Sequence, residues 1–278
     1  MTENNTPLIS IVAPTCNRAK LLKKMVNSVL TQSYQSWELI VIDDISTDDT
    51  EMMMNNFSKS DSRIKYFRIP RDKEPGITKY LNYGLNVAQG KYISRLDDDD
   101  YWMDNDVLKI QVEFLETNPD YVAVGGAAII VNEKGDHVFK YTKYEKDEDI
   151  RKNALMANPM VHTAALFRKD VVLSLGGYED LPYAEDWDLW LKLGKIGKIY
   201  NFQKYFTCYL SAGQNTSFIK QRPQSKEILK IIKKYRKDYP NYRKGFLING
   251  TQYLYSFLPN WFKKRFHSFM IYLKRNYF

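Results

Sequence analysis

The chain has 278 residues, of which 44% are hydrophobic and 27% charged, a balance typical of a soluble globular protein. This composition excludes a disordered or collagen-like chain, and the length fits two domains or one α/β domain with an extension. No apolar run approaches the roughly 18–20 residues that span a bilayer, and the N-terminus lacks a secretory-signal pattern. The two cysteines, Cys16 and Cys208, are too few for a disulfide framework, so we expect a reduced, cytosolic compartment.

The net charge of +8 is unevenly distributed along the chain. Residues 1–219 carry 26 Lys and Arg against 31 Asp and Glu, whereas residues 220–278 carry 15 against 2. We therefore expect a mildly acidic first domain over 1–219 and a basic, aromatic-rich helical extension over 220–278. Such an extension favours a polyanion, namely nucleic acid, anionic lipid or an acidic partner.

Apolar runs and helical patterns alternate over the first hundred residues. Buried strands are predicted at 8–14, 37–43, 63–69 and 91–96, and helices at 19–32, around 52–57 and at 77–88, with Gly90 as the C-cap. This alternation predicts βαβ units and a mostly parallel sheet with helices on both faces. Ligands of such sheets bind at the carboxyl ends of the strands, where polar residues stand at 15–18, 43–44 and 97–100.

The second half of the chain is less regular. We expect helices at 104–117, 145–156 and 185–193, and a strand at 121–131 that bends at Gly125 and Gly126. A further strand is predicted at 162–167, and two short strands within 197–210. The helix at 185–193 opens with acidic residues, which suits the positive end of its dipole.

The run Asp97, Asp98, Asp99 and Asp100 is the strongest chemical signal in the sequence. Adjacent carboxylates repel one another at neutral pH, and hard divalent ions such as Mg²⁺ or Mn²⁺ take oxygen ligands. At the end of an apolar strand the run therefore predicts a bound cation. The alternative interpretation is a solvated acidic turn, or an N-cap for the following helix.

Four segments in order resemble the signature segments of the inverting GT-A glycosyltransferases of family 2. They are ISIVAPTCNR (9–18), IVIDDISTDDT (40–50), GKYISRLDDDD (90–100) and AEDWDLWLKL (184–193), and the resemblance covers about residues 7–215. It implies an α/β fold of the GT-A, Rossmann-like type, with a mostly parallel sheet flanked by helices. It also implies a nucleotide-sugar donor, which we expect to be a UDP-sugar, and a Mn²⁺ or Mg²⁺ cofactor.

The resemblance further implies roles for individual residues on the donor side. Asp99 would ligate the metal that bridges the diphosphate, and Asp97 would lie near the ribose. The nucleotide-sugar would be bound by Pro14, Thr15, Asn17, Arg18, Asp43, Asp44, Lys79, Asp97 and Asp98. For Asp43 and Asp44, a turn followed by a helix N-cap is the structural alternative.

The acid pair at 185–186 maps on the position of the family's catalytic base. We assign the base to Asp186, with Glu185 as the close second, because the acceptor hydroxyl has a high pKa and needs a positioned base. His162 and Trp187 would lie on the acceptor side, although a structural histidine and a core tryptophan are the alternatives. Without the other segments, Glu185 and Asp186 would be ordinary charges at a helix N-terminus.

The sequence departs from the family pattern in two places. Where relatives often carry Arg-Asn, this chain has Leu81 and Asn82, so Lys79 or Arg95 would have to compensate. The segment CYLSAGQNTS (208–217) lacks the arginine and the histidine of many relatives. A histidine metal ligand is therefore absent there, and the phosphate contact would fall to Gln214, Asn215, Thr216 or Ser217.

The last part of the extension predicts an amphipathic helix. Between 258 and 273, apolar side chains fall on one helical face and basic ones largely on the other, which favours an anionic membrane surface. The alternative is a helix packed on the protein or on a second subunit. No recognised module supports nucleic-acid binding.

Together these features predict a metal-dependent inverting glycosyltransferase that moves a sugar to an acceptor hydroxyl in the assembly of a bacterial surface glycan. The acceptor would be a saccharide or a lipid-linked saccharide, and the enzyme cytoplasmic or peripheral on the inner membrane. Two other functions stay open. A sugar nucleotidyltransferase would need a glycine-rich phosphate loop, which PTCNRAK lacks. A non-catalytic binding module of the same fold would keep the pocket without turnover.

Overall fold

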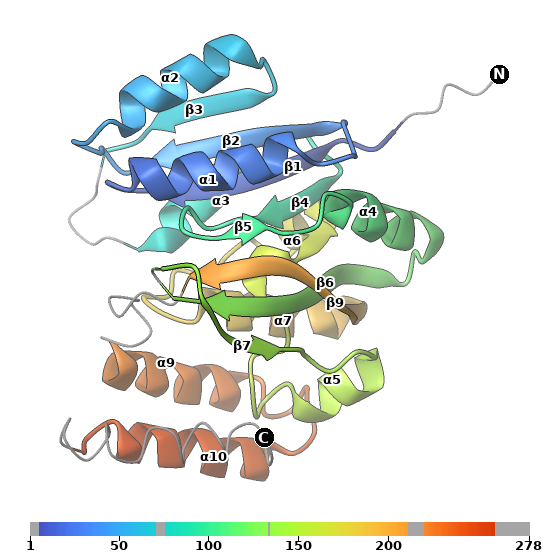
Figure 1. Cartoon of the computed structure of the whole chain (residues 1–278). Helices are drawn as coiled ribbons and strands as arrows, with labels where there is room; N and C mark the ends of the chain where they lie inside the picture. The colour runs from blue at the N-terminus through green and yellow to red at the C-terminus, as the bar shows by residue number, and fades with distance from the viewer. Residues whose placement is uncertain (1–5, 71–75, 133, 211–219, 259–278) are drawn as a thin grey trace.

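The computed structural model describes residues 6–70, 76–132, 134–210 and 220–258, and Figure 1 shows a central sheet with helices on both faces. The sheet has nine strands in the order β3-β2-β1-β4-β8-β6-β9-β5, and β7 pairs with β6. This is the mixed α/β arrangement that the sequence predicts, with its parallel part at the N-terminal end.

The first half of the sheet matches the sequence expectations closely. Its strands are β1 (Ile9–Thr15), β2 (Trp37–Asp43), β3 (Ile64–Arg68) and β4 (Tyr92–Arg95), and its helices are α1 (Ala19–Leu30), α2 (Thr50–Ser60) and α3 (Ile77–Val87). β1 pairs in parallel with both β2 and β4, and β2 with β3. Thr15 lies opposite Asp43 and Val12 opposite Arg95, so the polar segments that follow the three strands meet at one edge.

The second half of the sheet is mixed in direction. Its strands are β5 (Tyr101–Trp102), β6 (Tyr121–Val131), β7 (His137–Tyr141), β8 (Leu166–Arg168) and β9 (Lys198–Leu210). Its helices are α4 (Val107–Thr117), α5 (Asp147–Asn153), the short η1 (His162–Ala164), α6 (Lys169–Ser174) and α7 (Glu185–Ile196). β8 runs antiparallel to β4 and β6, while β6 and β9 are parallel.

Several expectations for this half were wrong. The predicted strand at 162–167 begins as a turn of 3₁₀ helix and becomes β8 only at Leu166. The two short strands within 197–210 are one strand, β9, whose register against β6 shifts near Gly125, where the bend was expected. β5, β7 and α6 were not predicted. In the first half, Gly90 does not cap α3, because the helix ends at Val87 with Ala88 as its C-cap. A Cβ on Gly90 would lie 2.6 Å from the Ser10 nitrogen, so close packing explains this glycine.

The two faces of the sheet bury separate apolar clusters. One face packs against α1, α2 and α4, through side chains such as Met25, Met54 and Leu108. The other packs against α3, α6 and α7, through Leu81, Val172 and Trp190. Because α7 lies on this second face, the acid pair at its start is carried to the edge where β1, β2 and β4 end.

The helices of the extension pack on the body. α9 (Gln221–Lys234) and α10 (Tyr242–Tyr255) lie side by side below α7 and β7 in Figure 1. α9 buries Ile231 and Ile232 against Trp187 and Leu191 of α7. No helix among the described residues is long and apolar enough to cross a membrane. The amphipathic helix expected from 258 to 273 lies almost wholly outside the described residues.

Candidate active site

The loops that follow β1 and β2 are joined by hydrogen bonds at the edge of the sheet. The Asn17 carbonyl oxygen Oδ1 accepts from the backbone nitrogen of Thr47 at 2.7 Å, and the Asn17 backbone nitrogen donates to Ser46 Oγ at 2.8 Å. Asn17 and Ile45 both have positive φ, at 54° and 45°. A left-handed conformation is costly for a β-branched residue such as Ile45, so strain is concentrated in these two loops.

Asp43 and Asp44 take different positions, although the sequence treats them as a pair. Asp43 is fully buried, and its two oxygens accept from Ser46 and from the Tyr66 hydroxyl. Asp44 instead lines a pocket of about 350 Å³ together with Cys16, Asn17, Ile45 and Pro70. The turn alternative therefore describes Asp43, whereas Asp44 is the one of the two that lines a pocket.

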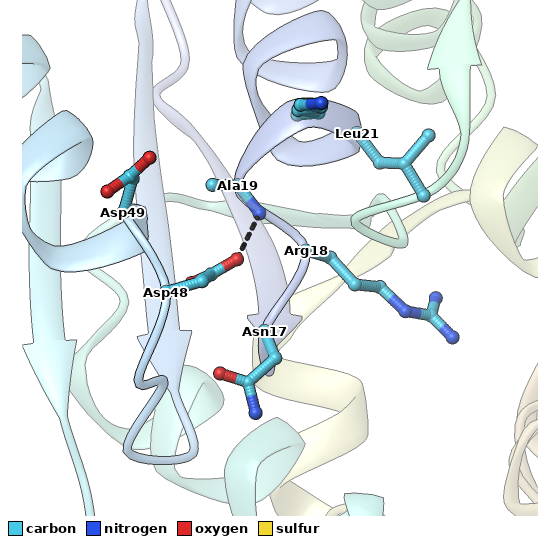
Figure 2. A pocket seen from close by; sticks show the side chains of 7 residues that line it. Asn17, Arg18, Ala19, Leu21, Asp48 and Asp49 are labelled. Atoms are coloured by element: carbon cyan, nitrogen blue, oxygen red, sulfur yellow. Dashed lines mark hydrogen bonds between the residues drawn. The ribbon is translucent and has the colours of Figure 1, made fainter.

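A second pocket of about 350 Å³ lies at the start of α1 (Figure 2). The carboxylate of Asp48 accepts from the backbone nitrogen of Ala19 at 3.0 Å, which binds the loop after β2 to the start of α1. Arg18 points to the opposite side from Asp48 and Asp49 in this view. Lys79 reaches the rim of the Asp44 pocket, where its ammonium donates to the Pro70 carbonyl at 2.9 Å.

The aspartate run is bound to the end of β1 through Asp98 and Asp99. Asp98 accepts from the Thr15 hydroxyl at 2.7 Å and from the Arg18 guanidinium at 3.0 Å. Asp99 pairs with the same guanidinium nitrogen at 2.7 Å. The structure thus brings together Thr15, Arg18, Asp98 and Asp99, as the sequence predicts.

Burial and mutual repulsion disfavour the charged forms of these carboxylates. Burial raises the pKa of Asp98 to about 6, against the opposing effect of Arg18. Burial, followed by the charge of Asp97, also raises the pKa of Asp99. A nearby cation would relieve this cost, and carboxylate oxygens are the ligands that Mg²⁺ and Mn²⁺ prefer.

The residues present fit a divalent ion that a diphosphate helps to hold. Within the described ranges, no group of three or more His, Cys, Asp or Glu side chains is arranged to hold a metal ion. Mg²⁺ in nucleotide sites is typically bound by one or two carboxylates plus substrate phosphates, so Asp99 needs no protein-only cage. The residues 211–219, which include the four expected phosphate contacts, lie outside the described residues.

Asp100, the last of the run, is buried and accepts from the Leu210 backbone nitrogen at 3.1 Å.

Arg95, at the end of β4, links the aspartate run to the acid pair on α7. Its Nε donates to Asp97 at 2.8 Å, and its Nη1 donates to Glu185 at 3.0 Å. The same Nη1 lies 2.6 Å from Nδ1 of His162, so that ring nitrogen accepts. The Arg95 side chain is only 5% exposed, so it is committed to these partners and does not reach a phosphate from the surface.

Tyr178, which sequence reasoning passed over, completes this network together with Asn82. The His162 Nε2 lies 2.9 Å from the Tyr178 hydroxyl, and the amide of Asn82 bonds both backbone groups of Tyr178, at 2.8 and 2.9 Å. Burial and the Arg95 charge hold the pKa of His162 well below its usual range, so the ring is neutral. Asn82 therefore supports Tyr178, while Leu81 is a core residue.

The acid pair begins α7 at a sharp turn. Ala184, the residue before it, has a left-handed backbone with φ of 59°. Asp186 Oδ2 accepts from the Asn158 amide at 2.6 Å, and Oδ1 from the Trp187 backbone nitrogen at 2.8 Å. Burial, followed by the charge of Glu185, raises the pKa of Asp186 to about 6. No local pattern in the sequence singles out Asn158, although it contacts Asp186.

The two expected acceptor-side residues are both buried. The Trp187 ring packs among α9 residues and donates to the Ala154 carbonyl at 2.8 Å. The His162 ring lies against Trp190, with ring centres 5.3 Å apart. For these two residues the structure matches the alternatives, a core tryptophan and a structural histidine. Cys16 and Cys208 do not form a disulfide with each other.

The relatives of the chain are glycosyltransferases. The sequence is 31% identical over 239 residues to an uncharacterized glycosyltransferase of Haemophilus influenzae, which covers 82% of this chain and 72% of that protein. It is 32% identical over 205 residues to the GalNAc(5)-diNAcBac-PP-undecaprenol beta-1,3-glucosyltransferase of Campylobacter jejuni, covering 73% of this chain and 64% of that protein.

Solved structures share the fold at low sequence identity. S. aureus TarS 1-349 in complex with UDP-GlcNAc superposes with a TM-score of 0.64 at 18% identity, over 81% of this chain and 64% of that one. The mannosyltransferase PcManGT of Pyrobaculum calidifontis, in complex with GDP-Man and Mn²⁺, gives 0.63 at 19%, over 89% and 70%. The expectation of a GT-A fold is thereby confirmed. The family model described as Glycosyl transferase family 2 matches residues 10–176, more than half of the sequence, and the chain therefore belongs to that family.

Proposed function

We propose that this glycosyltransferase is metal-dependent and inverting, and that it moves a sugar from a UDP-sugar to an acceptor hydroxyl in surface polysaccharide assembly. The observation that carries the proposal is the Arg95 bridge, which places the donor-side carboxylate Asp97 and the acceptor-side carboxylate Glu185 on one buried guanidinium. The sugar would then bind between these two sets of acidic groups. The named undecaprenol-linked activity of the Campylobacter relative supports a lipid-linked acceptor.

The nucleotide would occupy the Asp44 pocket. There the Asp44 carboxylate would accept from the base or the ribose, with Asn17 lining the same pocket. The carbonyl of Thr15 accepts from the Asp44 backbone nitrogen at 2.9 Å. Asp43 would act indirectly, because its oxygens already shape the turn through Ser46 and Tyr66. Lys79 at the rim would offer a positive charge to the donor.

The diphosphate would lie against Asp98, Asp99 and Arg18. Asp99 would hold the divalent ion, which supplies charge neutralisation to the departing nucleoside diphosphate. Arg18 would exchange its contact with Asp99 for one with phosphate, since its side chain is 43% exposed and free to move toward solvent. The complexes of fold neighbours with UDP-GlcNAc and with GDP-Man and Mn²⁺ are consistent with this assignment.

Asp186 would be the general base and Glu185 a positioning residue. Glu185 pairs with Arg95 at 3.0 Å, and this ion pair would direct its carboxylate away from the acceptor hydroxyl. Asp186, with a pKa of about 6, is ionised at neutral pH yet more basic than an ordinary aspartate. It would take the proton of the acceptor hydroxyl while that oxygen attacks the anomeric carbon on the face opposite the leaving phosphate, which inverts the configuration.

The extension would also place the enzyme on a membrane surface. α10 exposes Phe246, Leu247 and Leu254, at 44%, 67% and 68%, beside the cationic Arg243 and Lys244. Apolar side chains with adjacent basic groups favour the interface of an anionic bilayer. In this assignment, residues 1–219 form the catalytic domain and 220–278 the extension.

The test is a donor-hydrolysis screen with the full chain. UDP-, GDP-, dTDP- and CMP-sugars are incubated with Mn²⁺ or with EDTA, and free nucleotide is measured. We expect release from one UDP-sugar, abolished by EDTA and by Asp99→Ala but not by Glu113→Gln on the exposed side of α4. Failure of calorimetry to detect binding of any nucleoside diphosphate in the presence of Mn²⁺ would overturn the proposal.

A further inference from the structure

The helix that carries Asp186 is bonded to α9 at a buried aspartate. Asp188, which is fully buried two residues after Asp186, accepts from Lys234 at 2.9 Å and from the Tyr235 hydroxyl at 3.0 Å. A turn further along α7, the carbonyl of Leu191 accepts from the Tyr239 hydroxyl at 2.8 Å. Because a buried carboxylate is costly without such partners, α7 and α9 are held together at a fixed register.

α10 contacts the segment 154–158, whose last residue is bonded to Asp186. The buried Asn249 amide donates to the carbonyls of Leu155 and Met156, at 3.2 and 3.4 Å. Gly245, one helical turn earlier, packs so closely that a Cβ there would lie 2.5 Å from the Leu155 oxygen. The absence of a side chain at Gly245 is therefore what lets α10 approach this segment.

Segment 154–158 in turn contacts both Asp186 and its helix. Its last residue, Asn158, donates to Asp186 at 2.6 Å, and its first, Ala154, accepts from the Trp187 ring at 2.8 Å. The side-chain oxygen of Asn158 accepts from the Met160 nitrogen at 3.3 Å, which fixes the orientation of the amide. A displacement of this segment would thus reach the Asp186 carboxylate directly.

We propose that α9 and α10 belong to the catalytic machinery, as a brace that positions Asp186: α9 fixes its helix through Asp188, and α10 fixes its hydrogen-bond partner through segment 154–158. Asn249, Gly245, Lys234 and Tyr235 are then positioning residues. The family model ends at residue 176 and does not include these helices. The inference rests on the proposed role of Asp186 as the base, but its test needs no donor.

The readout is the titration of the Asp186 carboxylate in the full chain, followed by NMR of ¹³Cγ-labelled aspartate. The Asp186 signal is assigned as the one lost in Asp186→Asn. Besides Asn158, the groups that act on this carboxylate are Glu185, Arg95, Tyr141, Tyr178 and the Trp187 backbone nitrogen, and none of them is changed in the test. Removal of the amide in Asn158→Leu sets the reference, because loss of a hydrogen bond to the charged form raises the pKa.

Two glycines of α10 provide a matched pair of variants. Gly245→Ala would push the helix from segment 154–158, whereas Gly250→Ala meets nothing within 4 Å. We expect Gly245→Ala and Asn249→Ala to raise the Asp186 midpoint in the direction of Asn158→Leu, and Gly250→Ala to leave it at the wild-type value. A merely structural contact would lower the melting temperature without moving this midpoint.

The inference is overturned if Gly245→Ala and Asn249→Ala melt cooperatively and titrate like Gly250→Ala. Should both fail to fold, Tyr235→Phe decides through α9, since it removes one hydroxyl and keeps the ring. We then expect the Asp186 midpoint to move from its wild-type value, and an unchanged midpoint overturns the inference. Asp186→Asn that retains full transfer activity would instead contradict the proposed function, while leaving the brace intact.

Discussion

The two sets of acidic residues in the site are compensated in different ways. Asp98 and Asp99 share the guanidinium of Arg18, whose side chain is 43% exposed at the end of β1. Glu185 shares that of Arg95, which is 5% exposed and bonded to His162 as well. Under the proposed assignment, the countercharge of Asp98 and Asp99 would be exchanged for a metal ion or a phosphate contact, whereas that of Glu185 is built into the fold. The site would thus be adaptable where the nucleotide binds and fixed where the proton moves.

Removal of the base is expected to have the largest effect on activity. Asp186→Asn should lower the transfer rate about 10²–10⁴-fold with little change in donor affinity, because a positioned base contributes that much and Asp186 does not reach the nucleotide. At pH 7.5 the variant should also be at least as stable as the wild type. The folded pKa of about 6 lies above the ordinary 3.8, so the stabilisation present below pH 3.8 is lost as the pH rises through 6.

Kinetics and thermal melting check both parts of this expectation, with Glu148→Gln on the exposed face of α5 as the control. An Asp186→Asn enzyme that transfers sugar within threefold of the control would rule out Asp186 as the base and favour Glu185.

The stability of the protein should depend more on Arg95, at the buried pair Asp97 and Glu185, than on Arg18. Arg95→Met leaves Asp97 and Glu185 without their shared partner in a buried setting, which costs about 3–5 kcal/mol of unfolding free energy. Arg18→Met, at the exposed position, should cost less than about 1 kcal/mol. Urea denaturation of the two variants measures the difference. Equal losses would show that burial does not distinguish the two arginines.

The donor side of this comparison could be predicted from the sequence, and the acceptor side only in part. β1 to β4 alternate with their helices through local apolar periodicity, and the polar segments follow the strands directly. Thr15, Arg18, Asp98 and Asp99 meet because parallel strands end at one edge. Thr15 and Asp98 are 83 positions apart, but the general rule for parallel strands is enough to place them at the same edge.

The acceptor side depends on contacts between distant segments. Asn82 supports Tyr178 across 96 positions, and Arg95 reaches Glu185 across 90. No local pattern marks Asn158 or Tyr178, and the buried His162 and Trp187 have the same residue types as ligand-contacting groups would. The sequence predicts two short strands in place of β9 because the exposed residues in the middle of this strand interrupt its apolar run. The sequence also does not predict the different roles of Asp43 and Asp44, because the inward orientation of Asp43 depends on its bonds to Ser46 and Tyr66.

Metal dependence is the next effect in size and concerns Asp98 and Asp99, the carboxylates that share Arg18. EDTA or Asp99→Asn should lower donor hydrolysis about 10²-fold, because the ion supplies several kcal/mol of charge stabilisation to the departing diphosphate. Mn²⁺ added back should restore activity in the wild type after EDTA but not in Asp99→Asn. Calorimetry of UDP with Mn²⁺ measures binding separately, and full binding by Asp99→Asn would remove this residue from the metal site.

The pH dependence of the transfer rate tests the role of Asp186 without a mutation. The transfer rate should fall about tenfold for each pH unit below the Asp186 pKa of about 6, because the protonated carboxyl cannot take a proton from the acceptor. Above pH 7 the rate should reach a plateau. A rate that is constant between pH 4.5 and 7 would contradict a titrating base at this position.

The smallest effect concerns strain in the donor-side loops. Ile45 is 43% exposed and has a φ of 45°, so Ile45→Gly removes little buried surface and relieves a left-handed conformation that costs about 1–2 kcal/mol. Part of this gain is offset by the entropy of glycine in the unfolded chain, about 0.5–1 kcal/mol. We expect a net rise in unfolding free energy below about 1 kcal/mol, whereas Ile196→Gly, in the last turn of α7, should lower it. If Ile45→Gly also weakens UDP binding, then the strain orients the Asp44 pocket for the nucleotide; unchanged binding would mean that the loop tolerates the strain without using it.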